Sequence, residues 1–98
     1  MTVTTHTDVV TEQEWNQLRR HLDLSPRQAD IVRHLLYAES DKQIARELRI
    51  SLPTVRSHMG RLFHKFNLSD RVELLIHVFV CLRQCWRDGD EHQSEPDN

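Results

Sequence analysis

Residues 51–66, SLPTVRSHMGRLFHKF, combine basic side chains with apolar residues at helical spacing. The apolar set recurs every three or four residues and consists of Val55, Met59, Leu62 and Phe66. This spacing predicts a helix over 52–66 with one buried side. The opposite side carries Pro53, Arg56, Ser57, Gly60, Arg61 and His64, and no acid. A solvated helix face is the alternative, but such faces usually mix charges, so a basic face favours contact with an anion such as a nucleic-acid phosphate.

A second group with chemical potential is His77, Cys81 and Cys85, which lie four residues apart and therefore on one helix face. These are zinc-ligand residue types, but no fourth ligand has motif spacing, although His92 is available. Cysteines on an apolar face are usually small core residues. We therefore expect no metal, and an interchain disulfide is a minor alternative that the sequence cannot decide.

Enzyme motifs are missing from the sequence. It has no His-Glu-x-x-His, no nucleophile elbow, no phosphate-cradling glycine loop and no paired acids suited to a cleft, and its seven histidines are scattered. For His58 we expect a packing role with a hydrogen bond rather than catalysis. The prediction is a protein that is not an enzyme and needs no cofactor.

The elements that must position these residues all read as helices. Thr11, Ser25, Ser40 and Ser51 are predicted N-caps, for helices at 12–22, about 26–38, 41–48 and 52–66. Asn67 suits the left-handed end of the fourth helix, and Ser69 is the predicted cap of a last helix reaching about Gly89. No stretch reads as a strand. The fold class is therefore an all-α, compact helical bundle in which 41–48 and 52–66, joined by a short turn, have helix-turn-helix spacing.

Charge and composition divide the chain into four parts. We expect a disordered N-terminus at 1–10, an accessory helix at 11–23, a helical domain at 24–88 and an acidic, disordered tail at 89–98. Residues 41–71 hold seven basic and three acidic residues, whereas residues 87–98 hold five acids and a single arginine. The start of the chain has no basic and apolar leader pattern, and its apolar runs are too short for a bilayer. We therefore expect a cytoplasmic protein that does not associate with membranes.

Residues 24–75 resemble the LuxR-type (GerE-like) DNA-binding domain of bacterial transcription regulators. The matching motifs are L-S-P-R at 24–27, S-D-K-Q-I-A at 40–45, I-S-x-x-T-V-R-x-H at 50–58 and K-F-N-L-S-D-R at 65–71. The chain departs from the family at Gln28 and Ala29, where acids are usual, at Ala38, where glycine is usual, and at Gly60, where a longer polar side chain is common. If Ala38 is left-handed, it costs about 1 kcal/mol relative to glycine.

The resemblance implies a transcription regulator that binds double-stranded DNA, with the helix at 52–66 in the major groove. By the same resemblance, Arg56 and Ser57 correspond to base-contacting residues. Lys42, Thr54 and Lys65 correspond to phosphate contacts, and Arg61 suits either role. It also places the protein in the bacterial cytoplasm, associated with the nucleoid when bound. Relatives usually add a receiver or sensor domain, and 98 residues leave no room for either. We therefore expect a stand-alone regulator controlled by its abundance, its dimerisation or a partner such as RNA polymerase or a regulatory protein.

The last helix has two apolar stripes. One consists of Val72, Leu75, Phe79, Leu82 and Trp86, and the other of Leu74, Val78, Cys81 and Cys85. One stripe serves the core, and the other needs either the N-terminal helix or a second copy of the chain as its cover. The resemblance favours the copy, because relatives dimerise through this helix. We therefore predict a homodimer, with Leu74, Val78, Cys81 and Cys85 as its interface, on a pseudo-palindromic site.

Two other functions fit parts of the sequence. A promoter-reading region of a sigma factor also carries a T-V-R recognition helix, but the L-S-P-R and F-N-L-S-D-R segments favour the LuxR type. A protein-interaction module, such as an anti-activator or adaptor, would keep the fold with weak or no DNA binding. Gly60, the net charge of −2 and the acidic tail favour it, whereas Arg56, Arg61 and Lys65 oppose it.

Overall fold

The computed structural model describes the backbone of residues 10–94 and the side chains of residues 10–87. Within this part the chain forms five α-helices and no strand, which confirms the all-α prediction. The helices are α1 (Glu12–His21), α2 (Pro26–Leu36), α3 (Asp41–Leu48), α4 (Leu52–Phe66) and α5 (Arg71–Ser94). Their starts and ends lie within two residues of the predicted ones, except at the C-terminal end of α5.

The helix starts follow from local hydrogen bonds. Side-chain oxygens of Thr11, Ser25, Ser40 and Ser51 each accept the backbone N–H three residues later, as the sequence predicted. The predicted cap of α5, Ser69, is wrong. The Oδ1 of Asp70 accepts the N–H of Glu73 at 2.9 Å instead, and the N–H of Ser69 donates to the Glu73 carboxylate at 2.7 Å. Aspartate and serine are equally good caps, so adjacent candidates leave the choice to tertiary packing.

Left-handed residues follow four of the helices. They are Asp23, Ala38, Arg49 and Asn67, with φ between 54° and 62°. Asn67 confirms the predicted end of α4. The last residue of α2 is Leu36, two residues before the predicted end, and Ala38 lies in the connection that follows. In contrast, α5 continues past Gly89 to Ser94, because a glycine inside a helix costs only about 1 kcal/mol and does not end it alone. The predicted disordered tail, 89–98, therefore begins as helix, and 95–98 lie outside the described residues.

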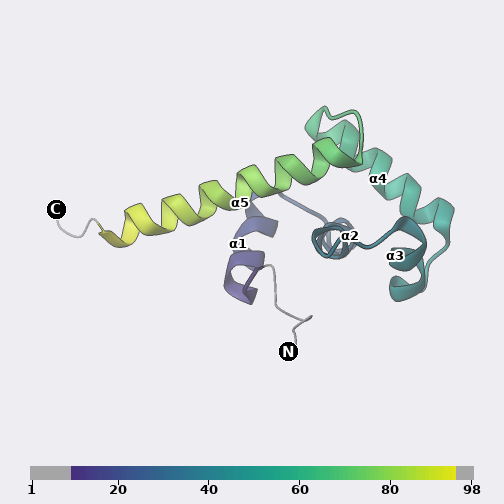
Figure 1. Cartoon of the computed structure of the whole chain (residues 1–98), viewed down its shortest axis with the longest axis horizontal. Helices are drawn as coiled ribbons and strands as arrows, with labels where there is room; N and C mark the ends of the chain where they lie inside the picture. Colours follow the sequence, from purple (N-terminus) through teal and green to yellow (C-terminus); the bar gives the residue numbers. More distant parts are fainter. Residues whose placement is uncertain (1–9, 95–98) are drawn as a thin grey trace.

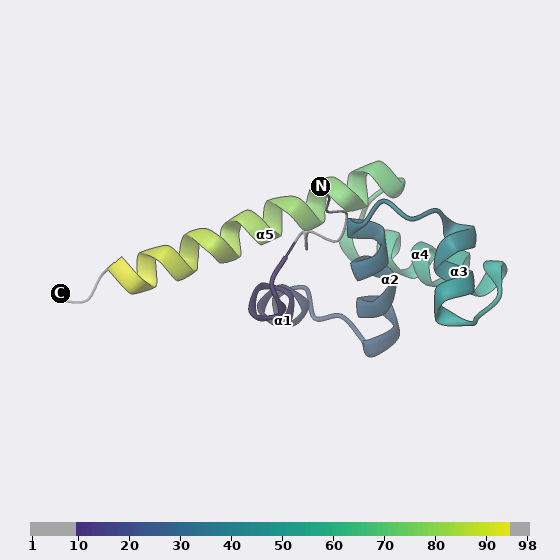
Figure 2. The same ribbon diagram turned by 60° about the horizontal axis from the view of Figure 1, so that its bottom comes forward.

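The helices pack around one core beside a projecting rod. α5 is the longest element, and its C-terminal half extends away from the other helices (Figure 1). α4 packs against α2, α3 and α5, whereas α1 packs against the middle of α5 (Figures 1 and 2). The core includes Leu18, Ile31, Leu35, Ile44, Leu62 and Leu74, each at most 1% exposed. All five helices contribute to it, so α4 is part of a single packed body.

The accessory helix α1 belongs to that body. Its Trp15 and Leu18 are buried, and the guanidinium of Arg33 on α2 lies 5.6 Å from the centre of the Trp15 ring. Arg33 also forms an ion pair with Glu12. Val10, just before α1, is 2% exposed, so the predicted disorder of 1–10 is wrong for this residue; residues 1–9 lie outside the described part.

Candidate nucleic-acid interface

A short turn joins α3 to α4. Arg49 takes the left-handed conformation at the end of α3, and the N–H of Ile50 donates to the carbonyl of Ala45 at 3.0 Å. Ser51 then caps α4, with Pro53 in its first turn, where the missing proline N–H costs no hydrogen bond. Ile44 and Ala45 face inward from α3. This arrangement is a helix-turn-helix with α4 as its second helix.

The two sides of α4 differ in chemistry. Val55, Met59 and Leu62 are buried, with Val55 and Leu62 fully inaccessible. The exposed residues are Pro53, Thr54, Arg56, Ser57, Gly60, Arg61, His64 and Lys65. No residue of α4 is acidic. The buried stripe therefore fixes the helix from one side and leaves a cationic, small-residue surface on the other.

The predicted contact residues do not all have free side chains. Lys42, Ser57 and Arg61 are exposed. The hydroxyl of Thr54 is hydrogen-bonded to that of Ser51 at 2.8 Å, within the cap of α4. The ammonium of Lys65 donates to the backbone carbonyl of Asp23, which precedes α2. Of the predicted phosphate contacts, Lys65 therefore has the strongest competing role within the fold.

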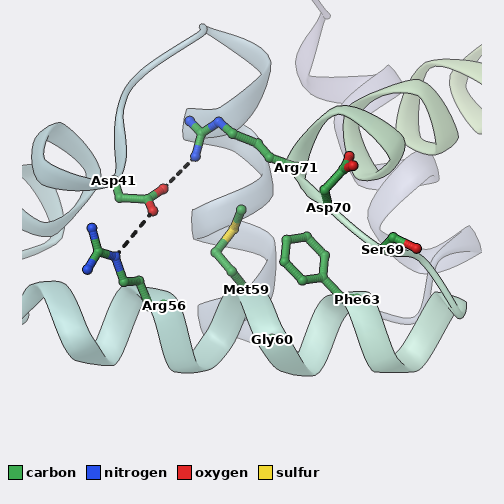
Figure 3. A pocket seen from close by; sticks show the side chains of 8 residues that line it. All are labelled: Asp41, Arg56, Met59, Gly60, Phe63, Ser69, Asp70 and Arg71. Atoms are coloured by element: carbon green, nitrogen blue, oxygen red, sulfur yellow. Dashed lines mark hydrogen bonds and ion pairs between the residues drawn. The ribbon is translucent and has the colours of Figure 1, made fainter.

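Arg56 belongs to a chain of charged groups at one edge of α4 (Figure 3). Its Nε lies 3.8 Å from Oδ2 of Asp41, and Oδ1 of Asp41 accepts a hydrogen bond from Nη1 of Arg71. The three residues come from α4, α3 and α5, and with Met59, Gly60, Phe63, Ser69 and Asp70 they line an open depression of about 350 Å³. Sequence reasoning missed Asp41 and Arg71, because residues 30 positions apart give no local signal of contact.

Gly60 lies in the middle of the exposed face. A Cβ built at this position would meet no atom within 4 Å, apart from its own helix and chain neighbours. Packing therefore does not require glycine here. What the missing side chain does is keep the centre of the cationic face flat, which allows a binding partner to approach the backbone closely.

His58 lies at the edge of the same helix and is half-buried, as a packing residue would be. Burial, together with the positive charges of Arg61 and Arg27, lowers the pKa of its imidazole below the ordinary value of 6.5. The ring is therefore predominantly neutral at pH 7, and the positive charge of this face comes from arginine and lysine.

The side chains predicted to form the dimer interface are buried within the monomer. Leu74, Val78, Cys81 and Cys85 are at most 6% exposed in the monomer, where α1 packs against α5. In contrast, large apolar side chains of α5 are exposed on its opposite side: Val72, Ile76, Phe79, Val80 and Trp86. The sequence offered two stripes of similar character, and the monomer itself buries the one assigned to the partner.

The group of His77, Cys81 and Cys85 is a core feature. Neither cysteine forms a disulfide, both are buried, and Sγ of Cys81 lies 3.8 Å from Nε2 of His77. Burial and the neighbouring Cys85 raise the pKa of the Cys81 thiol, which lowers its reactivity. Within residues 10–87, no three His, Cys, Asp or Glu side chains are placed to hold a metal ion.

No helix among the described residues is long and apolar enough to span a bilayer.

Comparison with known proteins supports the helix-turn-helix assignment. Residues 22–78, more than half of the chain, match the family GerE, bacterial regulatory proteins of the luxR family. The transcriptional regulatory protein TdiR of Thauera aromatica is 36% identical over 74 residues, which are 71% of this chain and 33% of TdiR. The chain thus spans about a third of that relative's length. No solved structure matches the chain. The chain belongs to the luxR family of bacterial regulatory proteins, with α3 and α4 as its helix-turn-helix.

Proposed function

We propose that this protein is a sequence-specific transcription regulator that inserts α4 into the major groove of double-stranded DNA. The observation that supports this most is the exposed side of α4, which carries Arg56, Arg61 and Lys65 and no acid. A helix is narrow enough for the major groove, and small residues such as Ser57 and Gly60 permit close approach. The name of the relative TdiR, a transcriptional regulatory protein, agrees with this function. The protein would then act in the bacterial cytoplasm.

Within the proposed complex, Arg56 and Ser57 read bases. Arg56 has 65% of its side chain exposed, and arginine pairs with guanine through two parallel hydrogen bonds. Arg61 and Lys42 contact phosphates, while Thr54 and the start of α4 lie against the sugar-phosphate backbone of the DNA. Lys65 contributes its charge from its position beside Asp23.

We further propose that the protein acts as a homodimer through the exposed side of α5. Val72, Ile76, Phe79 and Trp86 follow the alternating four- and three-residue spacing of packed helices, with Arg83 completing the series. Val72 and Ile76 are 65% and 57% exposed, which is unusual for isoleucine and valine on one continuous face. A two-fold dimer through this face presents two α4 helices to a pseudo-palindromic site. RNA polymerase or a regulatory protein remains a further proposed partner.

A duplex titration at two salt concentrations tests DNA binding. Fluorescence anisotropy of a labelled random duplex should show binding that weakens steeply between about 50 and 200 mM salt, with a log–log slope near −0.9 for each phosphate contact. The double variant Arg56→Ala/Arg61→Ala should lose most of this affinity, whereas Arg19→Ala/Arg20→Ala, with the same charge change on α1, should keep it. Absence of salt-dependent binding by the native chain refutes the proposed function.

That negative outcome would favour the second candidate, a protein-interaction module. One observation specifically favours it: the carboxylate of Asp41 lies against Arg56, at the edge of the face that would meet DNA. A module of this kind would bind a partner protein through the exposed side of α5 and would not bind duplex DNA.

Sedimentation analysis tests the dimer. At tens of micromolar the native chain should sediment as a dimer, and Ile76→Asp should sediment as a monomer, because a charge in an apolar interface is strongly unfavourable. Gln84→Asp, which adds the same charge at an exposed position away from the stripe, is the control. A monomeric native chain contradicts the dimer and leaves the DNA-binding proposal intact.

A further inference from the structure

The carboxylate of Asp41 lies between two arginines that come from different helices. Its Oδ1 accepts a hydrogen bond from Arg71, and its Oδ2 lies 3.8 Å from Nε of Arg56 (Figure 3). Each carboxylate oxygen of Asp41 therefore interacts with a different guanidinium group. The group has two positive charges and one negative charge, so it remains cationic overall.

Arg71 fixes the position of that carboxylate. Besides its bond to Asp41, Arg71 donates through Nη2 to the backbone carbonyl of Glu39. Asp41 is the first residue of α3, where the helix N-terminus also favours a negative charge. The side chain of Asp41 is only 25% exposed, compared with 65% for Arg56. Asp41 is thus the more enclosed partner, held by Arg71, and Arg56 is the more exposed one.

The atom through which Arg56 meets Asp41 matters for DNA recognition. Bidentate recognition of guanine O6 and N7 uses two donors of the planar guanidinium fork. A contact through Nε leaves the two terminal nitrogens for the base while it restricts the torsions of the long side chain. Restricting a flexible side chain before binding lowers the entropy lost on binding. Exposed ion pairs add little to stability, so the value of this contact lies in orientation.

We propose that Asp41 is a positioning residue for DNA recognition: it orients the guanidinium of Arg56 toward the base edge, and Arg71 anchors it. The inference rests on the proposed DNA-binding function. It also explains why an acid is tolerated near a surface that meets phosphates, since Arg71 offsets the charge of Asp41. Asp41 itself touches no base in this scheme.

Selection of bound sequences from a random duplex library, followed by affinity measurements on the selected site and on random duplex, tests the proposal. Asp41→Asn should reduce the preference at the base pair read by Arg56 by about tenfold. Its affinity for random duplex should stay equal or rise, because a negative charge has been removed. Asp30→Asn is the matched control, since Asp30 also pairs with an arginine, Arg27 at 3.5 Å, and its loss changes the net charge equally. It should leave the preference unchanged.

The variant Arg56→Lys keeps the charge and removes the planar fork, and it should lose the same base preference. In the Arg56→Lys background, Asp41→Asn should cause no further loss of preference, because the group that it orients is already gone. Additive losses, or equal effects of Asp41→Asn and Asp30→Asn, overturn the positioning role while DNA binding by the native chain stands. A native chain that binds no duplex overturns both proposals, and thermal unfolding verifies that each variant is folded.

Discussion

α4 and α5 each bury one side in the same core, but their opposite sides differ in chemistry. The exposed side of α4 carries arginines, a lysine and small residues. The exposed side of α5 carries Val72, Ile76, Phe79, Val80 and Trp86. The cationic surface of α4 attracts phosphate groups. The apolar surface of α5 is unfavourable in contact with water and is stabilised when an apolar partner covers it. The two helices are therefore suited to different classes of partner.

The difference also shows what an amphipathic pattern can decide. α4 has a single apolar stripe, so its spacing determines which side is buried. α5 has an apolar stripe on each side, and its spacing alone leaves the buried side open. Packing within the monomer resolves that choice, because α1 and α4 pack against α5, Leu74 and Val78 are buried, and Ile76 stays exposed.

The largest expected effect separates the two sides of α5. Leu74→Ala should lower the free energy of unfolding by about 3 kcal/mol, because it opens a cavity at a fully buried position. Ile76→Ala, measured in protein dilute enough to be monomeric, should lower it by less than about 0.5 kcal/mol. Urea unfolding followed by circular dichroism gives both values. Equal losses would mean that both stripes are buried in the monomer and would remove the contrast with α4.

A smaller effect tests the cationic side of α4. Gly60→Glu places an acid in the centre of that face, where an added Cβ has open space, so the fold should be kept. We expect about tenfold to hundredfold weaker binding to duplex DNA at low salt, from repulsion of phosphates. Gln84→Glu makes the same charge change on α5 and should leave the affinity within about twofold of the native value. Similar losses from both variants would show that net charge, and not the α4 surface, governs binding.

Local signals explain how much of this molecule the sequence could predict. N-caps such as Ser40 and Ser51 act over three residues, and they predicted the starts of α3 and α4 correctly. The cationic side of α4 followed from the spacing of Val55 and Leu62. The ion pair of Asp41 with Arg71 did not, because it depends on how α3 packs beside α5. The sequence offered the N-terminal helix and a second copy of the chain as covers of α5 but no local signal to choose between them, since Trp15 and Leu18 lie far from α5 in the sequence.

Ala38 allows fold stability to be changed without touching either surface. Its φ of 62° is a conformation that favours glycine, and it lies in the connection between α2 and α3. Ala38→Gly should therefore raise the free energy of unfolding by about 1 kcal/mol at most, since glycine relieves the strain but gains entropy in the unfolded chain. Ala45→Gly, inside α3, should have the opposite sign. DNA affinity and sedimentation should stay unchanged with Ala38→Gly, and a change in either would show that this connection sets the position of the helix-turn-helix.

The smallest expected effect is a pH dependence at the edge of α4. Since burial and the charges of Arg61 and Arg27 lower the pKa of His58 in the folded protein, the unfolded chain binds this proton more readily. Stability should be complete above the ordinary value of 6.5 and should fall as the pH drops from there toward the lower folded pKa. His58→Gln should remove this part of the pH dependence. NMR titration of the imidazole measures the pKa directly, and phosphates near Arg61 should raise it when duplex DNA is bound, because they offset the arginine charge. An imidazole pKa that does not respond to duplex would place the DNA away from this edge of α4 and weaken the contrast with α5.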